Sequence, residues 1–517
     1  MSGYPRPSHV AAVTLGDVAA AVGARDPGPG QVTGITHDSG QVRPGDLYAA
    51  LPGARRHGAE FAGQARERGA VAILTDPAGA ERARVAGLPL LVVDHAREVL
   101  GTAAATIYGH PADSMTVVGI TGTAGKTSAA YLVESGLAAG GHITCLIGTV
   151  ETRIAGVSVE SVRTTPEATD LHALLAAARE RGASAAVMEV SSHALAYGRV
   201  GGIRFTVGAF TNFGLDHLDF HADVEDYFAA KARLFDGRCQ AEVLNLDDPA
   251  VRRLVRPGRV TFSLAGDPTA TWHAEAIEPD GFGQRFLARA PSRGIEVTVR
   301  VGLPGRHNVA NALLALACLV EAGVAPDTAA AGIAACKGVP GRLERVAAPG
   351  PVLGVVDYAH KPDAIVAVLA ALRELGRGRI ICVLGAGGDR DPGKRPHMGQ
   401  AAAAGADVVV VTDDNPRSED PASIRAAVLA GARAQRGAGD GSVLEVAGRR
   451  EAIAVAVGLA EPGDIVAVLG KGHERGQESH GEVVPFDDRV ELAAALTQRY
   501  GDAVAGPVRG GASGVAP

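Results

Sequence analysis

The sequence predicts an α/β protein of about three domains. The chain has 517 residues, and one domain usually holds roughly 150. Strand-like apolar runs alternate with helix-like segments over most of the chain, which is typical of parallel sheets covered by helices. The last third repeats one design, an apolar strand that runs into a polar loop.

The composition favours a globular protein and excludes several classes. Apolar residues make up 46%, charged residues 21%, and the net charge is −7 without a long basic run, so we expect no nucleic-acid partner. We find no apolar stretch long enough for a membrane span and no signal peptide. The five cysteines lack CxxC spacing. We therefore expect reduced core cysteines and a cytoplasmic protein.

The first section, residues 1–112, is expected to be a small α/β domain. It holds the apolar runs "DLYAAL", "AVAILTD" and "PLLVVD", with the helix-like "EFAGQARERG" between two of them. The polar segment 108–115 makes a plausible linker to the next section.

The second section, residues 113–347, should hold a largely parallel sheet, because strands and helices alternate from "TVVGITGTAGKTS" to about residue 345. A stretch rich in Gly and Pro, 338–351, marks its end. In the third section, residues 348–505, four strands run into "DYAH", "GAGGDRD", "TDDNPR" and "GKGHE". Ligands of parallel sheets bind beyond the carboxyl ends of strands, so these loops should crowd one rim. We expect the tail, 506–517, to be disordered.

"GITGTAGKTS", residues 119–128, predicts a phosphate-binding loop between a strand and a helix. Gly122 and Gly125 allow backbone N–H groups to turn toward phosphate oxygens, Lys126 can reach the β- and γ-phosphates, and the Thr127 hydroxyl can bind Mg²⁺. The match is imperfect, because Ile120 stands where the first glycine is expected. The residues assigned to nucleotide binding here are Gly122, Thr123, Ala124, Gly125, Lys126, Thr127 and Ser128.

Acidic residues and histidines follow two later strands, which suggests a magnesium site near the phosphate loop. Glu189 ends one strand, and "LDHLDFH" with Asp216 and His217 follows another. Helix capping by Asp216 is the alternative. Lys231 lies among apolar positions of the helix-like segment 224–235, and spacing alone favours a surface lysine with its stem on apolar side chains.

A phosphate loop does not name a reaction, because kinases, GTPases, transport ATPases and ligases all use one. The motifs "GTAGKTS", "EVSSHAL", "TNFGLDHLDFH", "AAK" (229–231), "GRHNVANALLA", "PGRLE" and "DYAHKPD" narrow the choice. Together they resemble the Mur ligase family, ATP-dependent amide-forming enzymes of peptidoglycan synthesis. The resemblance covers the central and C-terminal sections in family order. It implies three domains: one for the UDP substrate, a central P-loop ATPase domain, and a Rossmann-like domain for the incoming amino acid.

The resemblance also implies a carbamate, derived from CO₂, on Lys231. A carbamate supplies an oxygen anion to Mg²⁺, whereas an ammonium group would repel the metal ion. The implied metal residues are Thr127, Glu189, His217 and Lys231, and the implied catalytic residues are Lys126, Lys231, His217 and Arg342.

Further residues follow from the resemblance, motif by motif. Asn308, Asn311, Arg342, Asp357 and His360 should serve ATP, with Arg342 at the γ-phosphate and Asp357 holding ribose or orienting His360. The muramyl substrate should be bound by Ser39, Thr164, Thr165, Ser191, Tyr197 and Arg199. The incoming amino acid should be surrounded by Arg395, Asp414, Asn415, Pro416, Arg417, Gly470 and Glu474.

Three positions depart from the family pattern. Ser39 is not followed by the frequent arginine, Tyr197 stands where a glutamine is common, and Lys361 replaces a frequent threonine. The first two put single contacts to the UDP substrate in doubt. The third puts contacts near Asp357 and His360 in doubt.

"THDSG", "RTTPEATD" and "GAGGDRDPGKRP" resemble the branch that adds the third residue to UDP-N-acetylmuramoyl-L-alanyl-D-glutamate, and "TDDNPR" resembles the part of it that adds meso-diaminopimelate. The implied reaction proceeds through an acyl phosphate and ADP. The base that deprotonates the amine is not identified; His217 and His360 are candidates. We expect a monomer.

Other functions stay open. Among the ligases, the alternatives are an enzyme that adds L-lysine, L-ornithine or LL-diaminopimelate, and a folylpolyglutamate-type ligase, whose sequence should lack the "DNPR" loop. The alternative from another class is a nucleotide switch that controls a partner.

The loop "TDDNPRSED" carries the prediction of substrate choice. Val408–Val411 should form a buried strand, so that residues 413–417 emerge at its carboxyl end, stiffened by Pro416. Arg417 can hold the distal carboxylate of diaminopimelate with two parallel hydrogen bonds, and lysine has no such carboxylate. The alternative is that Arg417 pairs with Asp413, Asp414 or Glu419 to hold the loop.

Overall fold

The computed structural model describes residues 4–25, 27–159, 161–436 and 442–501. The tail expected to be disordered lies outside them. The chain divides into two compact units: residues 1–277, 285–301 and 309–336 form the first, and residues 278–284, 302–308 and 337–517 form the second. The domain boundaries at 112, 347 and 505 stay predictions.

The N-terminal part of the first unit is built on a four-stranded parallel sheet, as the three apolar runs predict. Its order is β3 (Gly34–Thr36), β4 (Asp46–Ala50), β5 (Ala72–Thr75) and β6 (Leu90–Val92). Apolar residues of α1 (Leu15–Val22) and α4 (Ala96–Ile107) share one core with it, and those of α2 (Ala62–Glu67) and α3 (Pro77–Ala83) border a second. A short antiparallel pair, β1 (Val13–Thr14) and β2 (Gln31–Val32), lies beside α1.

The central sheet has eleven strands and carries the phosphate loop. Its order is β10 (Val157–Val159), β9 (Thr152–Ile154), β8 (Thr144–Ile147), β11 (Ala185–Glu189), β7 (Thr116–Thr121), β12 (Phe205–Phe210), β13 (Cys239–Asn245), β14 (Val260–Ser263), β15 (Trp272–Asp280), β16 (Gly283–Ala290) and β17 (Ile295–Val301). The strands from β8 to β15 pair in parallel. The helices of this section are α5 (Lys126–Ala139), α6 (Ala168–Glu180), α7 (Ser192–Ala196), α8 (Val224–Ala232), α9 (Arg306–Glu321) and α10 (Pro326–Ala334).

The predicted alternation of strands and helices up to residue 345 is wrong for residues 272–301. There β15, β16 and β17 follow one another without an α-helix between them. β15 and β16 are joined by a turn that contains Gly281, whose φ is +64°. The Asp280–Gly281 pair is typical of the turn of a β-hairpin.

The sheet of the second unit has six strands and confirms the repeated strand–loop design. Its order is β18 (Glu344–Val346), β19 (Leu353–Asp357), β23 (Ile465–Leu469), β20 (Ile380–Leu384), β21 (Val408–Val411) and β22 (Val443–Glu445), parallel except for β18. The carboxyl ends of β19, β20, β21 and β23 therefore meet at one rim. A hairpin of β24 (Gly476–Ser479) and β25 (Glu482–Pro485) follows β23.

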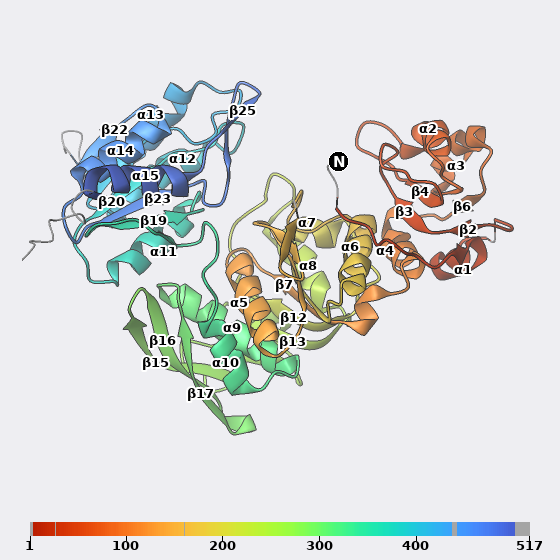
Figure 1. Ribbon diagram of the computed structural model, residues 1–517, viewed down its shortest axis with the longest axis horizontal. Coiled ribbons are helices and arrows are strands. Elements are labelled where there is room, and N and C mark those ends of the chain that lie inside the picture. The colour runs from red at the N-terminus through yellow and green to blue at the C-terminus, as the bar shows by residue number, and fades with distance from the viewer. Residues whose placement is uncertain (1–3, 26, 160, 437–441, 502–517) are drawn as a thin grey trace, which may run out of the picture. The chain divides into compact units, whose positions relative to one another are not determined.

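Helices cover both faces of this sheet (Figure 1). On one face, α14 (Arg449–Leu459) and α15 (Asp488–Tyr500) share a core with Ile381, Val383 and Val410. Another group of helices packs as a row: α11 (Pro362–Arg373), α12 (Lys394–Gly405) and α13 (Pro421–Arg436). Burial from both faces explains the unbroken valines of β21.

Within the residues that the structure describes, no helix combines the length and apolarity needed to cross a membrane. All five cysteines are free thiols, and Cys145, Cys318 and Cys382 are buried.

Candidate active site

The phosphate loop has the predicted strand–loop–helix form, between β7 and α5. Gly122 has φ +144° and Gly125 has φ +83°, conformations that side chains rarely allow. A Cβ on Gly122 would lie 1.9 Å from Thr211 Oγ1, and one on Gly125 would lie 2.4 Å from Asn311 Oδ1. Glycine is therefore required at both positions, and the Asn311 side chain lies directly against Gly125.

A segment after β12 holds the phosphate loop through hydrogen bonds. The Ala124 N–H donates to Asn212 Oδ1 at 3.0 Å, and the Thr211 hydroxyl donates to the Ala124 carbonyl at 2.6 Å. The Thr123 and Tyr227 hydroxyls lie 3.1 Å apart. The motif "TNFGLDH" did not predict the contacts of Thr211, Asn212 and Tyr227 with the loop.

Two lysine ammonium groups meet at one carbonyl oxygen of the loop. Lys126 Nζ and Lys231 Nζ each donate to the Gly122 carbonyl at 2.8 Å. Lys231 is only 1% exposed and lies over the Tyr227 ring. The surface position that spacing alone favoured for Lys231 is therefore wrong. Two like charges so close together repel each other.

Glu189 ends β11 with its carboxylate buried. It accepts hydrogen bonds from the Thr149 N–H at 2.8 Å and the Thr149 hydroxyl at 3.1 Å. Thr127 is buried in the first turn of α5. The strand that ends in Glu189 and the strand before the "LDHLDFH" loop were expected to be adjacent. They are not, because β7 lies between β11 and β12.

His217 lies in a more open place than the other predicted metal residues. Its side chain is 43% exposed and its Nε2 is 3.3 Å from Asp216 Oδ2. Its φ is +53°. The alternative role of Asp216 as a helix cap is wrong, because Asp223 caps α8. Across the described part of the chain, no group of three or more His, Cys, Asp and Glu side chains is arranged to hold a metal ion.

Most of the residues expected at the UDP substrate gather beside Glu189. The Thr165 hydroxyl donates to the Glu189 carbonyl at 2.8 Å and accepts from the Ser191 N–H at 3.2 Å. Thr164 Oγ1 lies 3.0 Å from Thr149 Oγ1. Ser39 lies elsewhere, in the N-terminal part, and donates to Gln64.

An excess of positive charge surrounds this group. The carboxylate of Glu167 faces three guanidinium groups, those of Arg199 at 2.8 Å, Arg163 at 3.0 Å and Arg97 at 3.8 Å. Arg97 and Arg199 also lie over the Tyr197 ring, at 5.4 and 5.5 Å. Burial lowers the pKa of Arg199 from its ordinary value. The cluster suits a ligand with negative charge; Arg97, Arg163 and Glu167 were not predicted.

In the second unit, Asp357 ends β19 and holds two backbone N–H groups. Its oxygens accept from the Leu343 and Ala359 N–H groups, both at 2.7 Å. Burial raises the pKa of the Asp357 carboxyl. His360 Nδ1 donates to the Tyr358 carbonyl at 2.7 Å, and the role of Asp357 toward ribose or His360 stays a prediction.

The other residues of this unit that are expected to serve ATP are also held by local contacts. The guanidinium of Arg342 lies 4.6 Å from the centre of the Tyr358 ring. Burial lowers the pKa of His360 to about 4, which makes it a weak base at neutral pH. Asn308 Nδ2 donates to the Pro304 carbonyl at 2.8 Å.

The loop after β21 is held by the β24 hairpin, which the sequence did not reveal. The Arg417 N–H donates to the Glu478 carbonyl at 3.1 Å, and the His480 N–H donates to the Arg417 carbonyl at 2.6 Å. Arg417 Nε lies 3.2 Å from Glu478 Oε2. Its φ of +54° is unusual for an arginine.

The alternative pairing of Arg417 with its neighbours in the loop is wrong, because those acids have other partners. Asp413 pairs with Arg425, and Glu419 pairs with Arg395 at 2.7 Å. Asp414 Oδ2 is 3.9 Å from Arg449 NH1.

The loops after β21 and β23 meet. A Cβ on Gly470 would lie 2.6 Å from Asp414 Oδ2, so the close approach requires glycine. Asn415 Nδ2 donates to Glu474 Oε2 at 2.9 Å. Between them lies Lys471, which is fully buried and was not predicted. The structure thus brings Asp414, Asn415, Gly470 and Glu474 together.

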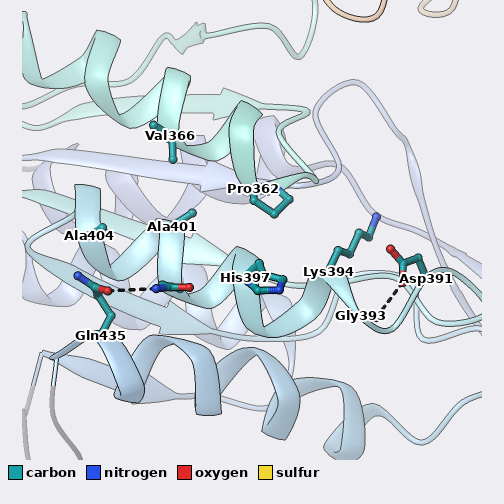
Figure 2. A pocket seen from close by; sticks show the side chains of 10 residues that line it. Pro362, Val366, Asp391, Gly393, Lys394, His397, Ala401, Ala404 and Gln435 are labelled. Carbon is teal, nitrogen blue, oxygen red and sulfur yellow. Dashed lines mark hydrogen bonds between the residues drawn. The ribbon is translucent and has the colours of Figure 1, made fainter. Parts of the chain in front are cut away.

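Figure 2 shows a hollow formed by α11, α12 and the end of α13, with Lys394 and His397 among its lining residues. None of the predicted site residues lines it.

Three family models match the chain. The Mur ligase family catalytic domain matches residues 31–108, the Mur ligase middle domain matches 120–319, and the Mur ligase glutamate ligase domain matches 341–472.

Curated relatives are similar over almost the whole chain. A UDP-N-acetylmuramoyl-L-alanyl-D-glutamate--2,6-diaminopimelate ligase from Streptomyces avermitilis is 53% identical, with 96% of this chain and 99% of the relative covered. A ligase of the same name from Corynebacterium glutamicum is 48% identical, with 90% and 92% covered.

Solved structures share the fold. A structure of a UDP-N-acetylmuramoyl-L-alanyl-D-glutamate--2,6-diaminopimelate ligase has a TM-score of 0.68 at 30% identity, with 95% of this chain and 99% of that chain covered. A MurF structure from Acinetobacter baumannii has a TM-score of 0.65 at 20% identity, with 95% and 99% covered, which shows likeness of fold.

Proposed function

The chain belongs to the Mur ligase family, and we propose that it is the ligase that joins meso-2,6-diaminopimelate to UDP-N-acetylmuramoyl-L-alanyl-D-glutamate, with ATP converted to ADP and phosphate. The observation that carries the proposal is the likeness to ligases of this name, 53% identical over 96% of the chain. The loop "TDDNPR" at the end of β21 supports the choice of amino acid. A cytoplasmic location stays a prediction.

The chemistry explains why such a ligase needs ATP. A carboxylate does not form an amide with an amine at a useful rate, because an oxide ion is not a viable leaving group. Phosphorylation of the D-glutamate γ-carboxylate by ATP turns one oxygen into part of a phosphate. The amine then attacks the acyl phosphate, and phosphate leaves from a tetrahedral intermediate.

The protein's contribution is to position the reactants and stabilise charge. Backbone N–H groups of the phosphate loop and the N-terminus of α5 would face the phosphates. Lys126 would leave the Gly122 carbonyl, to which it now donates, and approach the phosphoryl oxygens. Arg342 would stabilise charge on the transferred group.

The residues of the loop fit a carbamate on Lys231. Addition of CO₂ to Lys231 Nζ, with loss of protons, replaces an ammonium by an anion. The repulsion between the two ammonium groups at the Gly122 carbonyl would become an attraction, and the carbamate N–H could still donate to that carbonyl.

Mg²⁺ fits this set only with the carbamate present, because the metal ion prefers oxygen ligands. The residues that would hold it are Thr127, Glu189 and the carbamate of Lys231, with His217 as a further ligand. When bound, the ion would neutralise charge on the phosphates. Glu189 is buried at the end of β11, beside β7, the strand that leads into the phosphate loop.

Phosphate release by the full-length protein tests the proposal. We expect release from ATP only when both the muramyl dipeptide and diaminopimelate are present, and no release from the Lys126→Ala variant. Lys126 lies at a loop, so its removal should leave the fold intact, as circular dichroism would check. A nucleotide switch would release phosphate without either substrate, and that result would contradict the proposal.

A further inference from the structure

Lys471 is a charged side chain with no exposed surface in the loop after β23. Its Nζ donates to Asn415 Oδ1 at 2.8 Å and to Glu474 Oε2 at 3.2 Å. Asn415 belongs to the loop after β21, and β20 separates β21 from β23 in the sheet. Lys471 therefore connects two loops across the end of the strand between them.

These contacts allow Asn415 only one amide orientation. Asn415 Oδ1 accepts from Lys471 Nζ and from the Glu478 N–H at 3.0 Å, while Asn415 Nδ2 donates to Glu474. A lysine ammonium and a backbone N–H can only donate, and a carboxylate can only accept. A flipped amide would place donors against donors, so Lys471, the Glu478 N–H and Glu474 together fix the orientation of Asn415.

Lys471 also determines which carboxylate oxygen of Glu474 can accept a hydrogen bond from a ligand. Glu474 Oε2 is engaged by Lys471 and Asn415, and among the described residues Oε1 accepts no hydrogen bond. The negative charge of Glu474 is balanced by a cation that is itself buried. The carboxylate thus presents one oxygen, in a fixed direction and with reduced net charge.

We propose that Lys471 is a positioning residue for the incoming amino acid, and that it helps the site to prefer diaminopimelate to lysine. The proposal rests on the proposed function. The far end of diaminopimelate has both an ammonium and a carboxylate, and it needs donors and acceptors at fixed places. The far end of lysine is a bare ammonium. Without Lys471, a freely rotating Glu474 with its full charge would attract any ammonium group, so the discrimination would weaken.

Two variants separate the charge from the hydrogen bond. Lys471→Met removes both at similar length, and Lys471→Gln keeps a donor for Asn415 Oδ1. We expect Lys471→Met to raise the KM for diaminopimelate about tenfold or more, and Lys471→Gln to raise it less. The KM values for ATP and the muramyl dipeptide should change less than about twofold. The ratio of kcat/KM for diaminopimelate to kcat/KM for L-lysine should fall in the Met variant.

Arg450→Met is the matched control. Arg450 is 63% exposed and pairs with Glu491, so all the kinetic values of this variant should match those of the wild type. Circular dichroism and a thermal melt check the fold of each variant.

Unchanged KM for diaminopimelate and an unchanged ratio in Lys471→Met would overturn the inference. A rise of all three KM values together, or failure of both Lys471 variants to fold, would also overturn it, because Lys471 would then serve the fold as a whole. A wild type that does not ligate diaminopimelate would overturn the proposed function and this inference with it.

Discussion

Lys126 and Lys231 share one acceptor, the Gly122 carbonyl. A lone buried ammonium can be tolerated with enough hydrogen bonds, but a second one beside it adds repulsion in a place that water screens poorly. The proposed carbamate on Lys231 would relieve this repulsion and would provide an oxygen ligand. At the residue scale, the proposal therefore depends on the modification of one side chain.

Lys231→Ala should reduce ligation severely, because it removes the proposed carbamate. Added bicarbonate cannot restore the activity through an alanine, but short-chain carboxylates that enter the vacated space should restore part of it. The measurement is phosphate release with both substrates present. Lys337→Ala, which removes an exposed lysine of the second unit, is the control and should keep full activity. Near-normal activity of Lys231→Ala would show that a carbamate on Lys231 is not needed for ligation.

Arg417→Ala should raise the KM for diaminopimelate strongly and leave that for ATP nearly unchanged. The Arg417 guanidinium pairs with Glu478 and donates to the Gly388 carbonyl at 2.6 Å. These contacts fix its place, and a bound carboxylate would share the guanidinium with them. Loss of such a charge-assisted contact costs about 1.5–3 kcal/mol. Arg417→Lys should restore little, because it cannot form two parallel hydrogen bonds. If Arg417→Ala kept the wild-type KM for diaminopimelate, another group would recognise the distal carboxylate.

Sequence reasoning predicted residues that stand in motifs and missed residues that act through contacts. Asn415 and Glu474 were predicted, whereas Lys471, one position after Gly470, was not. Burial of a lysine depends on a partner 56 residues away, and no local pattern contains that information. Lys231 shows the same limit, since helical spacing alone favoured the surface.

At the scale of elements, strands with long valine or isoleucine runs were predicted well. β19, β20, β21 and β23 are buried on both faces, so their sequences are almost entirely apolar, with Asp357 at the end of β19 as the exception. β15 and β16 are partly exposed. Their sequences mix polar and apolar residues, so no continuous apolar run indicates a strand. The β24 hairpin is equally polar, yet it holds Arg417.

Helix α6 supplies a pH-dependent contribution to stability through His172. Its side chain is fully buried and its Nε2 donates to the Gly201 carbonyl at 2.9 Å. Burial lowers the pKa of His172 to about 4, whereas an unfolded histidine has a pKa of about 6.5. Between these values the unfolded state binds the proton and the folded state does not. The stability is therefore fully present above about pH 6.5 and is lost as the pH falls toward 4.

His172→Gln, whose amide can still donate to Gly201, should remove this dependence. Between pH 7 and pH 5 the wild type should lose on the order of 2 kcal/mol more unfolding free energy than the variant. Urea denaturation of both proteins at the two pH values measures the difference. Parallel losses in the two proteins would show that His172 is not the group responsible.

At the scale of the whole molecule, the family could be predicted because its motifs are short and local. The predicted ATP residues are divided between the two units, with Lys126 and Asn311 in the first and Arg342 and Asp357 in the second. Their local contacts follow from the strands that carry them. Magnesium and the carbamate stay predictions, and so do the monomeric state and the domain boundaries.

The mass of the product formed by the wild type tests the central claim most directly. The full-length protein is incubated with ATP, Mg²⁺, bicarbonate, the muramyl dipeptide and either meso-diaminopimelate, LL-diaminopimelate, L-lysine or L-ornithine. We predict a product heavier than the dipeptide by one diaminopimelate residue with the meso isomer, and little or no product with lysine or ornithine. Preferential addition of lysine, or no nucleotide-linked tripeptide with any of the four amino acids, would contradict the account.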